Sequence, residues 1–307
     1  MVFRIERGEV LAHAVKRLAH DQLANACQEL ANGPASVAHP SSGSVHDVRT
    51  AIRRTRALSR LVGPVVGQAA QRADHHLRAI ARQLSAARDG EVLLATFERV
   101  RRSAGVRGGG KLSAAREMLQ LRQRAGAIGN AGQRALRARL QRARRDVARW
   151  VPDDLRWPSL APGLIEVYRR CRQRMRSAYA RESSGAFHAW RRAVKDHRYH
   201  MQALAPQLPD ELGARRDGLE QLGDLLGEEH DLALLAGALR EEGACRGDDE
   251  GCRRLLAALE KRQRQLRAQA RPLGERLFAE KPSRLERRLR AVFRTSFRAF
   301  GHEPRET

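Results

Sequence analysis

Apolar side chains recur at intervals of three and four residues along almost the whole chain, the spacing that collects them on one face of an α-helix. Strand-like alternation is nearly absent, and the helix-forming residues Ala, Leu, Arg, Glu and Gln dominate. Clusters of Gly, Pro and Ser separate the apolar segments. The pattern predicts an all-α fold with helices at about 8–31, 44–62, 68–103, 113–125, 131–150, 160–181, 185–204, 210–243, 250–271 and 283–299.

The sequence contains an internal repeat with a shift of 142 residues, which aligns His46 with His188. Residues 45–61 (VHDVRTAIRRTRALSRL) align in this way with residues 187–203 (FHAWRRAVKDHRYHMQA), and the same shift continues downstream without a gap. A match at constant spacing over about fifty residues indicates an internal duplication.

A proline-rich stretch at 150–163 (WVPDDLRWPSLAPG) separates the two copies. We therefore divide the chain into a first half, residues 1–157, and a second half, residues 158–307. Each half is long enough to bury a core of its own, and each is predicted to form an up-and-down bundle of four or five helices.

Basic side chains form one row along each of the two repeated helices. The first basic row runs at steps of three and four residues, which places it in a stripe roughly 20 Å long beside the apolar face. Like charges at these spacings weaken a helix. We therefore expect both rows to lack protein carboxylates and to receive their counter-charge from a bound polyanion. The first basic row is His46, Arg49, Arg53, Arg56 and Arg60; the second is His188, Arg191, Lys195 and Arg198, with Arg192 beside it.

The charge of the chain supports a polyanionic partner. There are 59 Lys and Arg against 35 Asp and Glu, a formal net charge of +24. Such an excess attracts nucleic acid, anionic membranes and phosphate polymers. Arginine supplies most of it, and a guanidinium group donates two parallel hydrogen bonds to phosphate oxygens. Aromatic residues are only 4% of the chain, so side chains on which bases could stack are scarce. A bare polyanion is favoured, with nucleic acid as the alternative.

No arrangement of residues in the sequence indicates catalysis. No Ser/His/Asp or Cys/His nucleophile pattern can be placed, and the P-loop-like segment at 105–112 has Leu112 where a hydroxyl group is required. His46 and His188 lack carboxylate or histidine partners three or four residues further on, so we expect no metal ion and no other cofactor. The protein is predicted not to be an enzyme. The enzymatic alternative is a polyphosphate or triphosphate hydrolase, or an accessory of one.

The N-terminus and the cysteines predict a cytoplasmic protein. The segment MVFRIERGEV lacks the apolar core of a signal peptide, and no apolar stretch is long enough to span a membrane. We therefore expect no membrane partner. The four cysteines form no C-x-x-C pair, and we expect reduced thiols at Cys27, Cys171, Cys245 and Cys252.

The spacing of histidine and basic residues resembles that of the CHAD domain, the conserved histidine α-helical domain. The resemblance rests on H-x2-R-x3-R-R-x-R at 46–56, on H-x2-R-R-x2-K-x2-R-Y at 188–199, and on L-x3-R-D at 84–89. It implies two four-helix bundles related by pseudo-twofold symmetry, with a basic central groove that binds inorganic polyphosphate. It also implies an association with polyphosphate granules and contact with other granule proteins.

The resemblance also implies which side chains contact phosphate. In the first half these are His46, Arg49, Arg53, Arg54, Arg56 and Arg60, and in the second half His188, Arg191, Arg192, Lys195 and Arg198; Arg82, Arg88, Arg169 and Arg172 are further candidates. Three positions depart from the pattern of the family or of the repeat. Asp196 stands where Arg54 predicts a cation, His230 stands where Arg88 predicts an arginine, and Gly90 replaces a large apolar residue. The first two departures predict that the second half binds phosphate more weakly than the first half.

Overall fold

The computed structural model describes residues 2–31, 42–106, 109–207, 210–241, 245 and 249–298. Within them, all regular secondary structure is helical, as predicted. None of the described helices combines the length and the apolar character needed to cross a membrane. The helices are α1 (Leu11–Ala31), α2 (Ser42–Val66), α3 (Gln68–Ser103), α4 (Gly110–Ala125), α5 (Asn130–Trp150), η1 (Trp157–Leu160, a 3-10 helix), α6 (Ala161–Arg181), α7 (Ser184–Leu204), η2 (Ala205–Gln207, a 3-10 helix), α8 (Asp210–Glu241), α9 (Glu250–Leu277) and α10 (Pro282–Arg298).

The predicted helix ends agree closely with the structure except at two prolines. α2 continues past Pro64 to Val66, and α9 continues past Pro272 to Leu277. A proline removes one backbone hydrogen bond from a helix, and packing can compensate for that loss. In α9, Leu273 directly after the proline is buried in the larger hydrophobic core. Tertiary contacts therefore extend both helices beyond the positions where local sequence predicts their ends.

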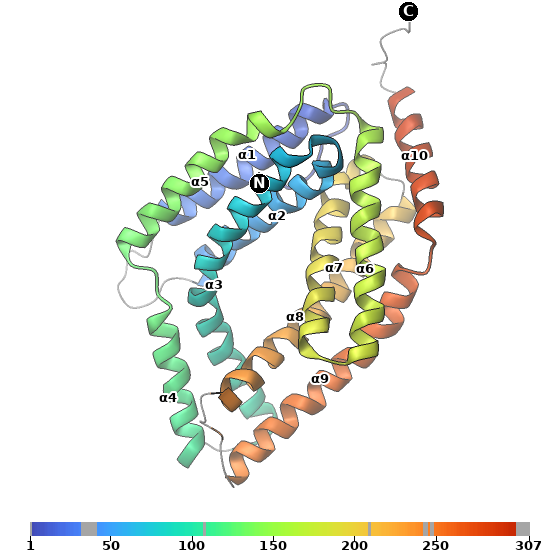
Figure 1. Ribbon diagram of the computed structural model, residues 1–307. Coiled ribbons are helices and arrows are strands. Elements are labelled where there is room, and N and C mark those ends of the chain that lie inside the picture. Colours follow the sequence, from blue (N-terminus) through green and yellow to red (C-terminus); the bar gives the residue numbers. More distant parts are fainter. Residues whose placement is uncertain are drawn as a thin grey trace, which may run out of the picture.

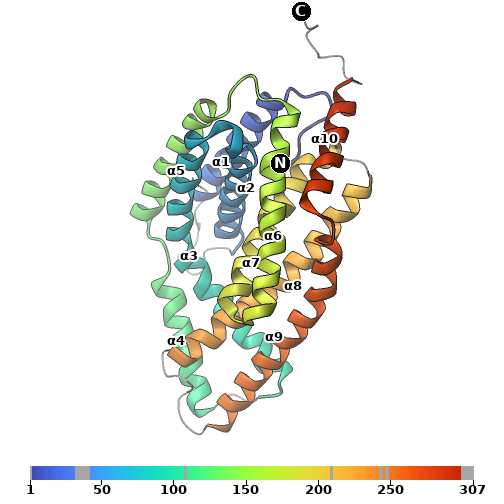
Figure 2. The ribbon, with the colours of Figure 1, turned by 45° about the vertical axis from the view of Figure 1, so that its right-hand side comes forward.

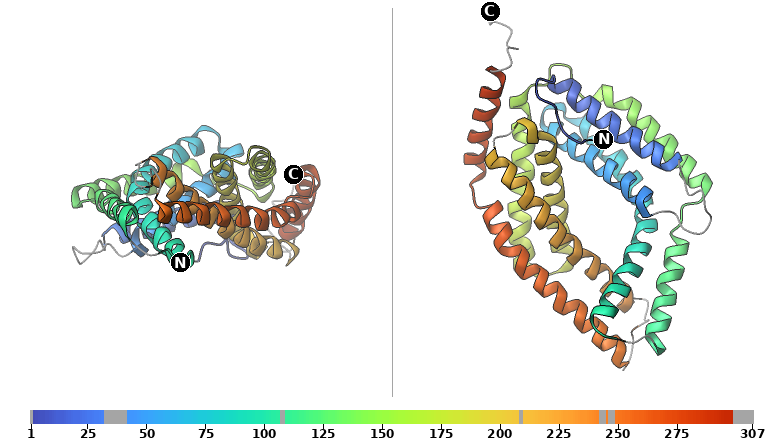
Figure 3. Two further views of the ribbon diagram at one scale, coloured as in Figure 1. Left: turned by 90° about the horizontal axis from the view of Figure 1, so that it is seen from below. Right: turned by 180° about the vertical axis from the view of Figure 1, so that it is seen from behind.

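Two groups of helices face each other across the middle of the molecule (Figure 1). One group contains α1, α2, α3 and α5, and the other contains α6, α7, α8 and α9, with α10 packed against α6. The groups meet where α2 packs against α7 and where α3 packs against α8. The other views place α5 on the outer side of the first group and α2, α3, α7 and α8 nearest the centre (Figure 2, Figure 3). The helices that carry the two basic rows are therefore neighbours.

Two hydrophobic cores stabilise this arrangement, and each draws side chains from both halves of the sequence. The larger core contains Leu58 of α2 together with Trp190 of α7. The smaller core contains Phe97 of α3 and Leu119 of α4 together with Leu235 of α8. The expectation of a separate core for each half is therefore wrong. The duplication itself and the boundary between the halves stay predictions.

α6 crosses α2 at Gly163, where the two backbones approach closely. An alanine Cβ at this position would overlap the carbonyl group of Leu61, so the two helices would have to separate. We predict that Gly163→Ala lowers the free energy of unfolding by about 1–3 kcal/mol, measured by urea denaturation.

Gly237→Ala is the matched control for this variant. Gly237 lies inside α8, and nothing lies within 4 Å of a Cβ added to it. This change should leave the free energy of unfolding equal or raise it by up to about 1 kcal/mol, because alanine favours a helix more than glycine does. Equal stability of the two variants would contradict a close crossing at Gly163.

Cys245 and Cys252 form a disulfide bond, so the expectation of reduced thiols is wrong for this pair. The chain reverses direction between α8 and α9, and this turn brings the two Cα atoms to 5.4 Å, within the range that a disulfide requires. Cys252 is buried in the smaller core. Cys27 and Cys171 are free and buried.

Candidate anion-binding site

The helices that carry the two basic rows, α2 and α7, enclose a cavity together with α3 and α8. Its volume is about 330 Å³. Three residues of the first row and two of the second row meet here, although the rows lie more than a hundred residues apart in the sequence. The cavity is lined by His46, Arg49, Arg53, Asp89, Val92, Arg99, Arg191, Lys195, Gly223, Asp224, Gly227, Glu228, His230, Asp231 and Leu234.

Three of the cations in the cavity wall are not paired with any side chain that the structure describes. Within the described part of the chain, Arg53, Arg191 and Lys195 make no ion pair or side-chain hydrogen bond. The Nε atom of Arg191 is buried without an acceptor. Arg49 differs, because its Nη1 atom donates a hydrogen bond to Oγ of Ser85 at 3.0 Å. A buried donor without an acceptor costs about 1–3 kcal/mol. An anionic ligand that accepts a hydrogen bond from Arg191 would remove this cost.

The positive charges in the cavity repel one another. The pKa of Lys195 is lowered from 10.5 to about 6, chiefly by burial and next by the charges of Arg191 and Arg53. Burial and Arg53 also lower the pKa of Arg191. Asp231 raises both pKa values, but its effect is smaller than those of burial and Arg53. The cavity therefore disfavours the charged forms of Arg191 and Lys195, and a bound anion would stabilise these charged forms.

His188 and His230 form a pair beside these cations. Their Nδ1 atoms are 3.1 Å apart, and their ring centroids are 4.2 Å apart. Burial, and next the charge of Arg191, lower the pKa of His188 to about 4 and that of His230 to about 3. Both rings are neutral near pH 7, and one Nδ1 donates to the other. Histidine at position 230 thus avoids a further buried cation where the repeat predicts an arginine.

Asp89, Asp224 and Asp231 line the cavity, and two glutamates at or near it are engaged by other arginines. Glu228 accepts hydrogen bonds from Arg262 at 2.9 and 3.0 Å, and Arg99 approaches it to 3.6 Å. Glu229 turns to another side of α8, where it accepts hydrogen bonds from Arg267. Among the described residues, no group of three His, Cys, Asp or Glu side chains is arranged to hold a metal ion.

The far end of the first row lies outside the cavity and is paired with carboxylates. Arg56 donates from Nε to Asp74 at 2.9 Å, and Arg60 pairs with both Asp74 and Asp196. For these arginines the expectation of a row without protein carboxylates is wrong. The physical reason is that α2 packs against α3 and α7, and each of these helices supplies one acid. Asp196 replaces a predicted cation because it faces Arg60.

Among the described side chains, the other predicted ligands also lie outside the cavity lining. Arg198 forms an ion pair with Glu220, so the expectation of an unpaired row is wrong here too. Arg54 donates a hydrogen bond to Gln22 at 3.3 Å and lies 5.2 Å from the ring centroid of Phe3. The remaining ones are the exposed Arg82, Arg169 and Arg192, the half-buried Arg172, and Arg88, whose side chain lies outside the described residues.

Arg99 is a cation of the cavity wall that the sequence analysis did not select. It lies outside both basic rows, and the equivalent position of the repeat is Glu241. The only sequence signal for it is its place on α3, ten residues after the Arg-Asp step that ends at Asp89. Its position in the cavity follows from the packing of α3 against α8.

Gly90, the third departure, has a steric reason. A Cβ at this position would lie 2.6 Å from Cα of Gln123 in α4. No side chain fits between two backbones at that distance, so a large apolar residue is excluded. The departure belongs to the packing of α3 on α4 and does not alter the cavity.

A family model described as the CHAD domain matches residues 21–240, a range that includes both basic rows and the whole cavity lining. The chain belongs to the CHAD domain family. Membership of this family supports a role connected with polyphosphate. A comparison with curated proteins gave no significant match.

The fold of this CHAD protein is similar to that of two solved structures. The CHAD domain from the plant Ricinus communis is 17% identical, with a TM-score of 0.59, and the match covers 96% of this chain and 95% of that chain. PptA from Streptomyces chartreusis is 16% identical, also with a TM-score of 0.59, and the match covers 90% of this chain and 100% of that chain. At these identities the similarity establishes the fold alone.

Proposed function

We propose that this CHAD protein binds inorganic polyphosphate in the cavity between α2, α3, α7 and α8, and that it does so without catalysing a reaction. The observation that carries the proposal is that Arg53, Arg191 and Lys195 share the cavity and make no ion pair or side-chain hydrogen bond with any described residue. A linear chain of phosphate groups presents several negative charges in a row and contains no base or sugar that the site would have to recognise.

The binding is expected to depend steeply on salt, because each cation that contacts phosphate releases condensed counterions from the polymer. Contacts to a flexible single-stranded polyanion each contribute about −0.7 to the slope of log K against log salt concentration, so the three unpaired cations predict a slope of about −2. Fluorescence anisotropy with labelled polyphosphate at several salt concentrations measures it. A slope near zero would mean that the cavity cations do not contact the ligand.

Nucleic acid is the first alternative ligand, and competition separates it from polyphosphate. No Phe, Tyr or Trp side chain lines the cavity, so it offers no surface on which a base could stack. Polyphosphate should therefore displace labelled single-stranded DNA from the protein, while DNA should fail to displace labelled polyphosphate. The reverse outcome would identify a nucleic-acid-binding protein.

A polyphosphate hydrolase is the second alternative. Hydrolysis of a phosphate polymer usually requires divalent metal ions held by carboxylates near the reacting phosphate. Among the described residues, the acids of the cavity form no group of three that could hold a metal ion, and Glu228 is engaged by Arg262, which supports binding without catalysis. Incubation of the purified protein with polyphosphate and Mg²⁺ or Mn²⁺ tests this. Release of phosphate that disappears in a cavity variant would contradict the proposal.

We also propose that the same cavity brings the protein to polyphosphate granules in the cytoplasm, where it would meet other granule proteins. The support is the unpaired positive charge of Arg53, Arg191 and Lys195, which favours long polyanions over single phosphates. A fluorescent fusion of the full chain should co-localise with granules. Unchanged co-localisation after loss of cavity binding would separate granule attachment from this site.

A further inference from the structure

A second basic surface lies on α5, away from the central cavity. This helix contains seven arginines and a single acidic residue, Asp146, which pairs with Arg149. Four of the arginines, named here the outer arginine face, are exposed and make no ion pair within the described part of the chain. They are Arg134, Arg137, Arg142 and Arg145. At 1.5 Å per residue they extend over about 16 Å of the helix.

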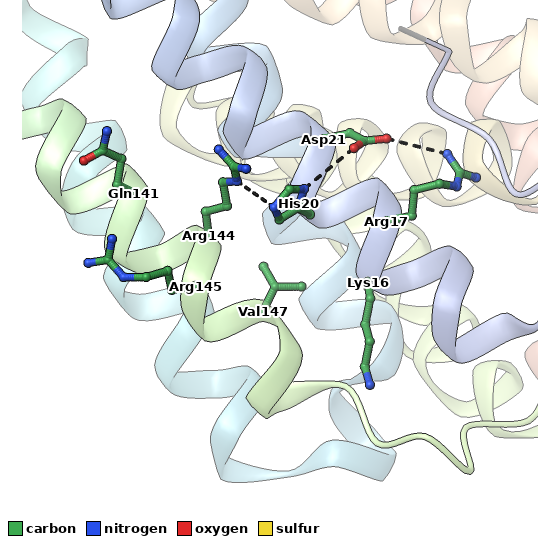
Figure 4. Close-up of a pocket in the computed structure, with 8 residues that line it drawn as sticks. All are labelled: Lys16, Arg17, His20, Asp21, Gln141, Arg144, Arg145 and Val147. Atoms are coloured by element: carbon green, nitrogen blue, oxygen red, sulfur yellow. Dashed lines mark hydrogen bonds and ion pairs between the residues drawn. The ribbon is translucent and has the colours of Figure 1, made fainter.

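The outer arginine face adjoins, at Arg145, a groove between α5 and α1 whose lining residues are drawn in Figure 4. The groove has a volume of about 720 Å³, and Arg145 belongs to both surfaces. Arg144 donates from Nε to Nε2 of His20 at 2.7 Å, a contact that positions its guanidinium group without neutralising it. The acids nearby hold other cations, since Asp153 pairs with Lys16, and Glu9 and Asp21 both pair with Arg17. The charges of Arg144 and Arg145 are therefore left for a ligand.

The outer arginine face and the central cavity lie on opposite sides of one layer of helices. α5 packs against α1 and α3, whereas the cavity is bounded by α2, α3, α7 and α8. Figure 1 and Figure 3 show α2 and α3 between α5 and the centre of the molecule. A polyanion bound in the cavity therefore leaves the outer face accessible to a different molecule.

We propose that the outer arginine face and the α1–α5 groove bind a second polyphosphate chain, so that one protein molecule joins two chains. This inference rests on the proposed function of the cavity and extends it from binding to cross-linking. Charge complementarity identifies the occupant as a polyanion. The groove lining contains no Phe, Tyr or Trp side chain, which favours a phosphate polymer over a nucleic acid with exposed bases.

Fluorescence cross-correlation with two populations of long polyphosphate, each carrying a different dye, tests the inference. The wild-type protein should make the two dyes diffuse together. The triple variant Arg134→Gln/Arg142→Gln/Arg145→Gln should reduce this co-diffusion about tenfold, because it removes three exposed charge contacts. Its affinity for a short polyphosphate that occupies the cavity should be unchanged.

The matched control removes the same charge elsewhere. Arg284, Arg287 and Arg294 are exposed on α10 and make no ion pair within the described residues. Their replacement by glutamine should leave co-diffusion intact. The inference is overturned if the α10 control loses as much co-diffusion as the α5 variant, if the α5 variant joins chains like the wild type, or if the wild type binds polyphosphate without joining chains.

Two further outcomes separate this inference from the proposed function. A wild-type protein that binds no polyphosphate overturns both. A variant with a disabled cavity isolates the outer face, and we expect it to bind long polyphosphate weakly and to join no chains. If single-stranded DNA displaces polyphosphate from that variant and polyphosphate does not displace DNA, the outer face binds nucleic acid and the inference is wrong.

Discussion

Replacing Arg53 and Arg191 together by alanine is expected to weaken polyphosphate binding at least about a hundredfold. Neither guanidinium group has a partner among the described residues, so the ligand supplies their counter-charge. Each charge-assisted contact is worth about 1.5–3 kcal/mol, and two of them account for a loss of this size. Isothermal titration calorimetry with the full chain measures it. Thermal unfolding should show no loss of stability, because the change removes two half-buried charges that repel each other.

The matched control is Arg56→Ala/Arg198→Ala, which removes two cations of the same basic rows that lie outside the cavity. Arg56 is paired with Asp74 and Arg198 with Glu220. After the change, Asp74 keeps its contact with Arg60. We expect this variant to lose less than about fivefold in affinity, because both guanidinium groups already have protein counter-charges and lie outside the cavity. If it loses as much as the cavity variant, the ligand follows both rows along their whole length and the cavity is not the site.

Polyphosphate binding near pH 7 is expected to take up about one proton per protein molecule, and Lys195 is the group that receives it. The pKa of Lys195 in the empty cavity is about 6, so its amine is mostly neutral at this pH. A polyanion favours the charged form and raises this pKa. Affinity should therefore rise as pH falls, by up to about tenfold per pH unit across the neutral range, and should level off below about pH 6. Calorimetry in two buffers with different ionisation enthalpies counts the protons.

Two variants of Lys195 test the assignment. Lys195→Arg keeps a permanent charge, so it should bind polyphosphate without proton uptake. Lys195→Met removes the charge, so it should bind more weakly, also without uptake. An unchanged proton count in either variant would assign the proton to another group.

The lowered pKa of Lys195 also determines whether the stability of the empty protein rises or falls with pH. In the unfolded chain Lys195 takes its ordinary pKa of 10.5, so the unfolded state binds more protons than the folded state between about pH 6 and that value. The stability of the empty protein should therefore rise with pH across this range. Lys195→Met should remove this contribution and should be more stable than the wild type near pH 7.

Helix positions and four of the cations in the cavity wall could be predicted from local sequence. Steps of three and four residues fix which side chains share one face of a helix, whatever the helix packs against. Because that spacing recurs after His46 and after His188, the sequence predicts two helices that bind the same kind of ligand. Arg49, Arg53, Arg191 and Lys195 line the cavity because α2 and α7 turn these faces toward each other.

The part of the site that could not be predicted depends on contacts between distant segments. Whether an arginine of a row is neutralised is decided by acids on other helices, such as Asp74 of α3 for Arg56 and Arg60. No spacing within α2 contains that information. Similarly, the neutral state of His188 depends on its burial against His230 of α8.

The disulfide and the prolines inside helices have the same cause. Cys245 and Cys252 come together only because the chain reverses between α8 and α9. α2 and α9 continue beyond Pro64 and Pro272 because neighbouring helices compensate for the missing hydrogen bonds. In each case a long-range interaction overrides what the local sequence favours.

The sharing of both cores between the halves has a consequence for biosynthesis. While the ribosome has delivered only the first half, Phe97 of α3 and Leu119 of α4 lack the apolar side chains of α8 and α9 that cover them in the finished protein. The nascent chain therefore exposes hydrophobic surface until its C-terminal segments emerge. During this period chaperones would protect it from aggregation.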